Sequence, residues 1–457
     1  SQTVEGAVPE TDEKTTTHGG IGAPDAGRRS RGSWLPGTDG PGGPRRLQLW
    51  WSGRGDRRAR RRERRRDRHR RHPVRHRTFQ VLAAAVALFV VVATVSFLTS
   101  EIGKPGSLSA RLAEWARDHG GGNVVADVEN WWYSHHPPAR GGKPPPGAIP
   151  APVTVPTVTW SAATGTLPPP GDIAPLVTPA VAGEGVWHPA GRTFNGAPVV
   201  YEAYLRPDPV YTSLVAGVAW MDTSVLKASL YSGSYIPGGG PWKQTAPIGT
   251  GPAQSLVAAF NSGFRMQDAG GGYFTQGQMV VPLRNGAASI VIYKDGAMTV
   301  GEWGRDVAMS PNVVAVRQNL KLLVDDGQPA PDLSMGSWGA TLGNAVRVWR
   351  SGLGVTPDGA ILYAAGPGLD VPSLARLLQR AGAVRAMELD INTDWVNLSV
   401  YNPTAPDTTA SGANGATLLS TMSGGAGRFF TGSWNRDFFT MSLPSSSGGG
   451  SFGRGRY

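Results

Sequence analysis

The 457-residue chain contains no cysteine. It therefore has no disulfides and no thiolate metal ligands, so its folded part depends on buried side chains for stability. Most of the chain also lacks a basic surface, although the formal net charge is +11. Fourteen arginines and only three carboxylates lie between Arg54 and Arg77, and this segment alone accounts for the excess. The rest of the chain gives no general charge argument for nucleic-acid binding.

The arginine segment itself has two interpretations. A nucleic-acid arm would normally carry aromatic side chains for base stacking or a recognisable binding module, and this segment has neither. Contact with anionic membrane lipids needs only the charges, each of which contributes about 1 kcal/mol near the surface. We therefore expect membrane lipids as the partner of this flank and no nucleic-acid partner.

Long apolar runs are scarce, and the one that stands out extends from Val81 to Leu98 without a charged residue. A run of this length rises about 27 Å as a helix, close to the thickness of the membrane hydrocarbon. The alternatives are a buried soluble helix and a cleaved signal peptide, and the long preceding region disfavours the signal peptide. Arginines before the run hold the N-terminus in the cytoplasm. We predict a single-pass cell-membrane protein with an extracellular C-terminal domain.

Composition divides the chain into five parts. The first has too little apolar character to fold and the third begins with short amphipathic patterns that fit either the bilayer surface or the face of a domain. The predicted parts are a disordered arginine-rich cytoplasmic tail (1–77), a transmembrane helix (78–100), juxtamembrane helices with a proline-rich spacer (101–182), a folded domain (183–442) and a second disordered tail (443–457).

Short apolar runs between turn residues predict many strands and few helices in the folded domain, which makes its fold class α+β with a mixed β-sheet. A helix is expected at 372–380, with Asp370 as its N-cap and Gly382 just past its end. A second helix is expected at 417–423. The expected strands are 199–204, 213–220, 228–231, 255–260, 278–282, 289–293, 298–300, 313–318 and 320–324.

The candidate chemistry lies between Arg350 and Tyr401. Two strand-like runs flank Pro-Asp-Gly at 357–359, which predicts a hairpin turn. Residues 384–391 alternate in polarity, and as a strand they would place Glu388 and Asp390 on one face, about 7 Å apart. Paired carboxyl groups commonly carry glycosyl transfer to water. Their spacing lies between the retaining and inverting ranges and leaves the stereochemical outcome open.

These segments resemble the phosphodiester glycosidase family. The hairpin beginning at Arg350 reads Arg-x-Gly-x-Gly-Val-Thr-x-Asp-Gly, a helix ending in Ala-Gly-Ala follows, and a strand finishes in Leu-Asp at Asp390. Asn-Ser-Gly-Phe from Asn261 is similar to the family's Asn-Gly-Gly-Phe segment, and the resemblance spans about residues 250–442. It implies a hydrolase of a sugar-phosphate diester or related linkage, with an envelope glycan or glycosyl phosphodiester as substrate and Asp390 and Glu388 as catalytic residues.

Four further residues are candidates for substrate binding. Arg350 matches the family's hairpin, and Arg265 follows the Asn261 segment. A guanidinium donates two parallel hydrogen bonds, which suits a phosphate. The Asn261 amide both donates and accepts toward sugar hydroxyls. His188 is a candidate acid or base.

The chain departs from the family after Asp390. Members usually continue with a Gly-Gly-Gly-Ser-type run that permits close backbone approach, whereas Ile391 to Trp395 follow here. The alternative function is therefore a non-catalytic module of the same fold that binds or scaffolds envelope glycans. Asp-x-Asn-x-Asp from Asp390 begins like a calcium loop but lacks that loop's glycine and, with Tyr401 at the twelfth position, its glutamate. We expect no metal and no cofactor.

Overall fold

The computed structural model describes residues 54–100, 108–151, 165–234, 236–238, 240–333, 338, 347–405, 407–431 and 436–444. Residues 1–53 of the expected N-terminal tail (1–77) and residues 445–457 of the expected C-terminal tail (443–457) lie outside the described residues. Part of the expected spacer, 152–164, lies outside them as well. Among the described residues the helices are α1 (Arg54–Thr99), α2 (Leu108–Ala116), α3 (Gly122–His135), α4 (Thr250–Ala253) and α5 (Val371–Arg380), with a π-helical turn η1 (Arg117–Gly121) and a 3-10 turn η5 (Arg428–Phe430).

Helix α1 contains the long apolar run. Its part Arg77–Thr99 contains an 18-residue window with a mean hydropathy of 2.8 and is long enough to cross a membrane. Such a helix suits either a membrane anchor or a signal sequence. The helix begins at Arg54, inside the stretch that we expected to be disordered, and arginine is a good helix former.

The remaining chain is built mainly from three antiparallel sheets, in agreement with the predicted α+β class. The largest has the order β1 (His188–Pro189), β4 (Val200–Leu205), β5 (Ala216–Met221), β16 (Ile361–Leu369), β15 (Val348–Val355), β17 (Arg385–Glu388), β13 (Leu322–Asp325) and β14 (Gln328–Pro329). The second has the order β11 (Met298–Glu302), β10 (Ala288–Tyr293), β12 (Val313–Gln318), β8 (Tyr273–Thr275) and β9 (Gln278–Val281). The third has the order β19 (Gly415–Thr417), β18 (Leu398–Tyr401), β7 (Leu256–Asn261), β20 (Phe438–Ser442) and β6 (Lys227–Tyr231), and β2 (Thr193–Phe194) pairs with β3 (Ala197–Pro198).

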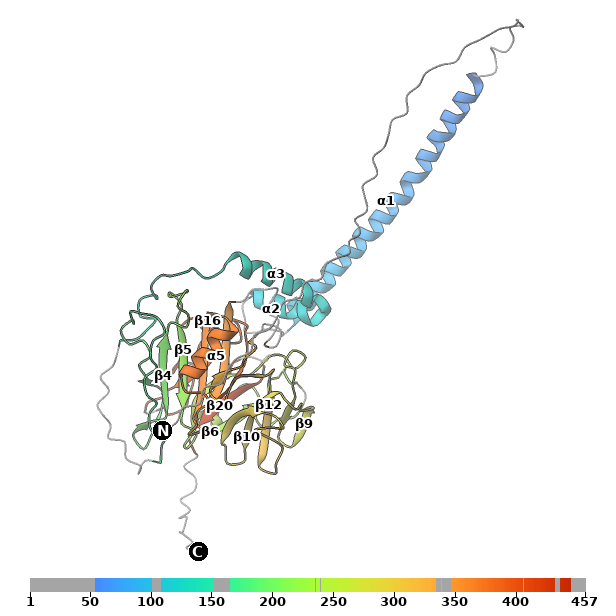
Figure 1. The fold of residues 1–457 in the computed structure, drawn as a ribbon. Helices are drawn as coiled ribbons and strands as arrows, with labels where there is room; N and C mark the ends of the chain where they lie inside the picture. The colour runs from blue at the N-terminus through green and yellow to red at the C-terminus, as the bar shows by residue number, and fades with distance from the viewer. Residues whose placement is uncertain are drawn as a thin grey trace, which may run out of the picture. The chain divides into compact units, whose positions relative to one another are not determined.

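The predicted hairpin and the helix after it are confirmed. Gly359 has a φ of +89°, a conformation that side chains disfavour, and the turn there joins β15 to β16. Helix α5 starts at the predicted cap, where the Asp370 carboxylate accepts a hydrogen bond from the Ser373 backbone N–H at 2.7 Å. Its apolar face packs on β15 and β16 of the largest sheet (Figure 1).

The largest sheet is buried on both faces. Along β16, Tyr363 faces the core shared with the other sheets, whereas its neighbour Leu362 faces the core beneath α5. Strands buried on both faces are apolar throughout rather than alternating in polarity. This explains why β16 reads as a continuous apolar run.

Three expected features differ in the structure. The strand expected at 384–391 ends at Glu388, and Asp390 lies beyond it. The alternation of side chains along a strand therefore does not determine where the Asp390 side chain points. The segment 417–423 is no helix: Thr417 ends β19, the Leu418 N–H donates to the Leu398 carbonyl of β18 at 3.0 Å, and turns follow. The described part of the proline-rich stretch bonds to the domain, since Ile173 is buried and its N–H donates to the Gly185 carbonyl at 2.8 Å.

Candidate functional site

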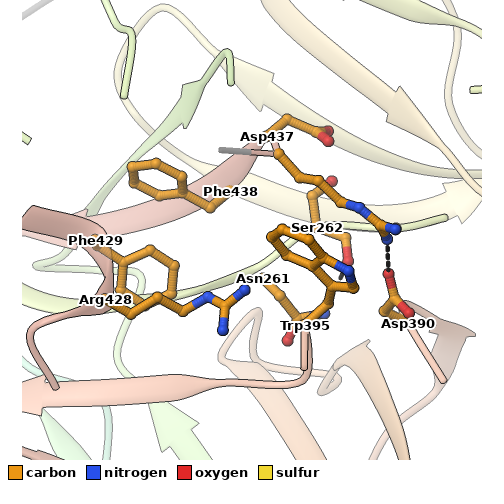
Figure 2. A pocket seen from close by; sticks show the side chains of 10 residues that line it. Asn261, Ser262, Asp390, Trp395, Arg428, Phe429, Asp437 and Phe438 are labelled. Carbon is orange, nitrogen blue, oxygen red and sulfur yellow. Dashed lines mark hydrogen bonds and ion pairs between the residues drawn. The ribbon is translucent and has the colours of Figure 1, made fainter. Parts of the chain in front are cut away.

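A pocket lies where three elements of the fold end or begin. Asn261 closes β7, Asp390 follows β17 by two residues, and Asp437 immediately precedes β20. The pocket contains about 310 Å³ of space between its atoms, part of it open to solvent. Figure 2 shows its lining, which comprises Asn261, Ser262, Gly263, Asp390, Trp395, Arg428, Phe429, Arg436, Asp437 and Phe438.

Asp390 is one of the two carboxyl groups that line the pocket, the other being Asp437, and it is only 2% exposed. Its Oδ2 accepts a hydrogen bond from Nη1 of Arg436 at 2.8 Å, and its Oδ1 accepts one from the Asn392 N–H at 2.9 Å. Burial raises the pKa of Asp390, and the charge of Arg436 opposes that rise. A carboxyl group whose pKa is raised exchanges protons nearer to neutral pH than an ordinary aspartate.

Two guanidinium groups flank the indole ring of Trp395. Arg428 lies 4.6 Å from the ring centroid and Arg436 lies 4.3 Å from it. Figure 2 shows the ring between Arg428 and the guanidinium that is joined to Asp390. Burial lowers the pKa of Arg428 to about 10, so this group is still cationic at neutral pH. The pocket therefore carries two cations held in place by one aromatic ring.

A second carboxylate reaches this cluster from outside the sheets. Glu114 belongs to α2, is 2% exposed, and accepts a hydrogen bond from Nη2 of Arg436 at 3.1 Å. It also pairs with Arg265, whose Nη1 donates to Asp118 at 3.1 Å. Burial alone would raise the pKa of Glu114, but Arg436 and Arg265 lower it to about 2. Glu114 is therefore ionised at neutral pH.

The Asn261 amide holds strand ends together. Its Oδ1 accepts from the Tyr363 hydroxyl at 2.7 Å and the Asn397 N–H at 3.1 Å. Its Nδ2 donates to the Ser262 carbonyl at 2.8 Å and to Oγ of Ser351 at 3.1 Å. An amide side chain has two donors and two lone pairs. Because all four are occupied, Asn261 shapes the pocket rather than presenting a free amide to it.

The two residues after Asn261 bring the backbone to the pocket. A Cβ at Gly263 would lie 2.8 Å from Cγ of Asn319, so only glycine fits at this position. The Ser262 hydroxyl is buried and has no hydrogen-bond partner among the described residues. A buried hydroxyl without a partner costs free energy, and a bound ligand could restore its hydrogen bond.

Arg350 and Glu388 do not line the pocket. Both are fully buried, and Nη1 of Arg350 lies 2.5 Å from Oε1 of Glu388. Nε of Arg350 donates to the Leu369 carbonyl at 2.9 Å. They form an ion pair inside the largest sheet, because β15 and β17 are neighbouring strands. His188 lies on the edge strand β1 and is likewise absent from the pocket lining.

The structure thus brings Asn261 and Asp390 to one pocket, with Arg265 joined to it through Glu114. Sequence reasoning did not identify Arg428, Arg436 or Glu114 as site residues. No local motif surrounds them, and each reaches the pocket only through the tertiary fold. Among the described residues, no group of three or more His, Asp or Glu side chains is arranged to hold a metal ion.

One comparison with known proteins, the scan against family models, agrees with the sequence resemblance. Residues 254–390 match the model of the phosphodiester glycosidase family. No curated protein sequence matches the chain. One similar solved structure is the catalytic domain of zebrafish N-acetylglucosamine-1-phosphodiester alpha-N-acetylglucosaminidase, auto-inhibited by pro-peptide, with 14% identity and a TM-score of 0.36 over 56% of this chain and 87% of that chain.

Two bacterial structures are also similar. A hypothetical protein from Synechocystis has 12% identity and a TM-score of 0.32 over 56% of this chain and 64% of that chain. A putative exported protein from Burkholderia pseudomallei has 12% identity and a TM-score of 0.30 over 52% of this chain and 76% of that chain.

Proposed function

Since residues 254–390 belong to the phosphodiester glycosidase family, we propose that the domain hydrolyses the bond between a sugar and a phosphate in a glycosyl phosphodiester. The observation that carries this proposal is the contact between Asp390 and Arg436 in the pocket. It combines a carboxyl group that can move a proton with a guanidinium that can hold an anion. Both functions are needed to cleave such a bond.

The arginines supply the anion-binding part of the proposed reaction. Arg436 and Arg265 together already hold one anion, the carboxylate of Glu114. A phosphodiester also carries a single negative charge and offers oxygen acceptors to the same donors. Nε of Arg436 has no partner among the described residues and adds one more donor. The substrate's phosphate would bind there, with Arg428 as the second cation across Trp395.

Asp390 supplies the proton transfer. Water attacks the anomeric carbon, the bond from that carbon to the phosphate oxygen breaks, and its electron pair stays on the phosphate. Asp390 accepts the proton that the water loses. The phosphate leaves as a stable anion. It therefore needs protonation less than the sugar hydroxyl group that leaves in ordinary glycoside hydrolysis. One carboxylate with cationic support can therefore serve where most glycosidases use two.

We extend the proposal to location and substrate. The apolar part of α1 anchors the chain in a membrane, with the arginine segment on the cytoplasmic side. The domain that follows then lies outside the cell, and its substrates are phosphodiester-containing glycans of the cell envelope.

The test is hydrolysis of glycosyl phosphodiesters by the full chain in detergent micelles, followed as release of reducing sugar and of phosphomonoester. The Asp390→Asn variant is expected to lose about 10²- to 10⁴-fold in rate, the usual contribution of a general base. Asp295→Asn is the matched control, because Asp295 is exposed in the turn between β10 and β11. Equal turnover by all three proteins would remove Asp390 from the mechanism.

The alternative of a glycan-binding module has its own support in the structure. Trp395 lies five positions after Asp390 and lines the pocket, and an indole ring in a pocket wall can stack on a sugar. Saturable glycan binding by the wild-type chain without any product, whichever phosphodiester is offered, would favour this alternative over hydrolysis.

A further inference from the structure

Helices α2 and α3 carry an apolar stripe that nothing in the described structure covers. Its two residues on α2 are four positions apart, and its successive residues on α3 are four, three and one positions apart. The apolar side chains therefore share one face of each helix. Helices of soluble domains normally bury such a stripe. The apolar stripe consists of Leu108, Leu112, Val124, Val128, Trp131 and Trp132, each between 51% and 69% exposed.

The stripe begins beside the end of the candidate membrane helix. Nε1 of Trp115 in α2 donates to Oγ of Ser96 at 3.2 Å, and the rings of Trp115 and Phe97 lie 6.1 Å apart in an edge-on contact. The Arg111 guanidinium lies 5.3 Å from the Phe97 ring centroid. Ser96 and Phe97 are in the last apolar turn of α1, which ends at Thr99. Helix α2 is therefore fixed to the point where α1 would leave the membrane.

A bilayer surface is the occupant that fits this position. Tryptophan is enriched at the membrane–water interface, where the ring is apolar and its N–H remains hydrated. An amphipathic helix can lie there with its apolar face among the acyl chains and its polar face in water. Because α2 contacts the end of α1, the bilayer is beside the stripe in every copy of an anchored chain.

We propose that the apolar stripe lies in the surface of the membrane that α1 enters, and that the pocket therefore acts on glycosyl phosphodiesters carried by lipids of that surface. The second half of this statement rests on the proposed hydrolase function. The first half does not.

Glu114 connects the stripe to the pocket. It follows Leu112 by two positions, which is about 200° around a helix, so the two side chains leave α2 on opposite sides. The Leu112 side faces the membrane, and the Glu114 side binds Arg265 and Arg436. A helix with side chains is about 10–12 Å across, which places these guanidinium groups about one helix diameter from the bilayer.

This distance favours a substrate that is anchored in the same surface. A phosphodiester with a lipid on one side and a sugar on the other keeps its lipid in the bilayer while its polar part extends into water. Enzyme and substrate then share one surface, and the substrate's effective concentration at the pocket reaches the millimolar range. A soluble diester has no such advantage.

The absence of cysteine allows a direct test of the surface. Single cysteines at Leu112 and Val128 would carry spin labels in the full chain, reconstituted in vesicles of phosphatidylcholine and phosphatidylglycerol. Met309→Cys is the matched control, because Met309 is an exposed apolar side chain of the domain, 45% exposed. We expect oxygen to relax the labels at 112 and 128 more than a water-soluble nickel chelate does, and the reverse at 309.

The spin labels test whether the apolar stripe lies in the membrane surface, and they do so without any assay of activity. Labels at 112 and 128 that behave like the label at 309 would show a water-exposed stripe and overturn the proposal. Labels shielded from both reagents would show that protein covers the stripe, either a second copy or another chain, and would overturn it equally.

The second half is tested by two substrates in the same vesicles. One is a glycosyl phosphodiester with a long-chain lipid, and the other has the same sugar and phosphate with a methyl group. For the Trp131→Ser/Trp132→Ser variant we expect an about tenfold loss of activity on the lipid substrate, equivalent to about 1.4 kcal/mol, and an unchanged rate on the methyl substrate. An equal effect on both would overturn the lipid assignment. No hydrolysis of either would overturn the hydrolase function, while the labels would still decide the surface.

Discussion

Glu114 and Arg436 are 322 residues apart in sequence, yet Oε1 of Glu114 lies 3.1 Å from Nη2 of Arg436. The same guanidinium holds Asp390 through Nη1 at 2.8 Å. One cation therefore joins two carboxylates, and Glu114 also pairs with Arg265 and Arg117. An anion that binds Nη1 or Nη2 of Arg436 therefore competes with a carboxylate of the chain itself.

Glu114→Gln should therefore strengthen anion binding. Glutamine keeps the shape of the side chain and removes its charge, so Arg265 and Arg436 become available to an external anion. We expect the Kd of inorganic phosphate to fall about tenfold, or about 1.4 kcal/mol, close to the lower end of what a hydrogen bond to a charged group contributes. Calorimetry on the full chain measures this. Asp268→Asn, which alters an exposed acid, serves as the control. Unchanged or weaker phosphate binding in Glu114→Gln would contradict the competition.

The attachment of α2 should weaken in acid. The pKa of Glu114 is lowered from 4.5 to about 2 in the folded chain. A lowered pKa contributes stability that is fully present above pH 4.5 and is lost as the pH falls toward 2. Hydrogen exchange of α2 amides, compared with α5 amides in the same sample, should accelerate in that window. The Glu114→Gln variant should show no such change between pH 4.5 and 2. A wild-type ratio that is flat across the window would exclude Glu114 as the attachment.

Asp390 should set the acid limb of the pH–rate profile of the proposed hydrolysis. Burial raises its pKa, and a general base works only when it is ionised, so activity should rise with pH through a midpoint above the ordinary aspartate value of 3.8.

Arg436→Lys keeps a charge near Asp390 but loses the planar fork, so we expect a higher KM for the diester with a smaller effect on kcat. A pH–rate profile of each protein provides both tests. An acid limb unchanged in Asp390→Asn would assign the titration to another group.

Local signals in the sequence predict local structure here and fail to predict the pocket. The cap at Asp370 and the turn at 357–359 were identifiable because a few adjacent residues determine each of them. The partner of Asp390 was not, because Arg436 lies 46 residues away in sequence and next to Asp390 only in the folded chain. The motif likewise placed Arg350 in the site, although the pairing of β15 with β17 buries it against Glu388. A sequence pattern does not tell which of several arginines faces a cavity.

Trp395 should hold both pocket arginines in position. It contacts the Arg428 and Arg436 guanidinium groups and is 7% exposed. Trp395→Ala removes a large buried ring, so we expect a loss of about 3–5 kcal/mol in the free energy of unfolding. Trp395→Phe keeps an aromatic face and should retain most of the phosphate affinity, whereas Trp395→Ala should not. Unfolding and phosphate binding are measured on the same samples. Equal phosphate affinity in the two variants would show that the ring does not orient the guanidinium groups.

Glu388 should matter for stability and not for the reaction. Glu388→Gln leaves the charge of Arg350 buried without its carboxylate, which costs about 3–5 kcal/mol in comparable buried pairs. Replacing both residues by apolar ones, Arg350→Met with Glu388→Leu, removes the charges together and should recover most of that loss. Thermal unfolding of the single and double variants gives this comparison. The double variant should also keep the wild-type kcat per folded molecule, because neither side chain lines the pocket. A double variant that is as stable as the wild type but inactive would return Glu388 or Arg350 to the chemistry.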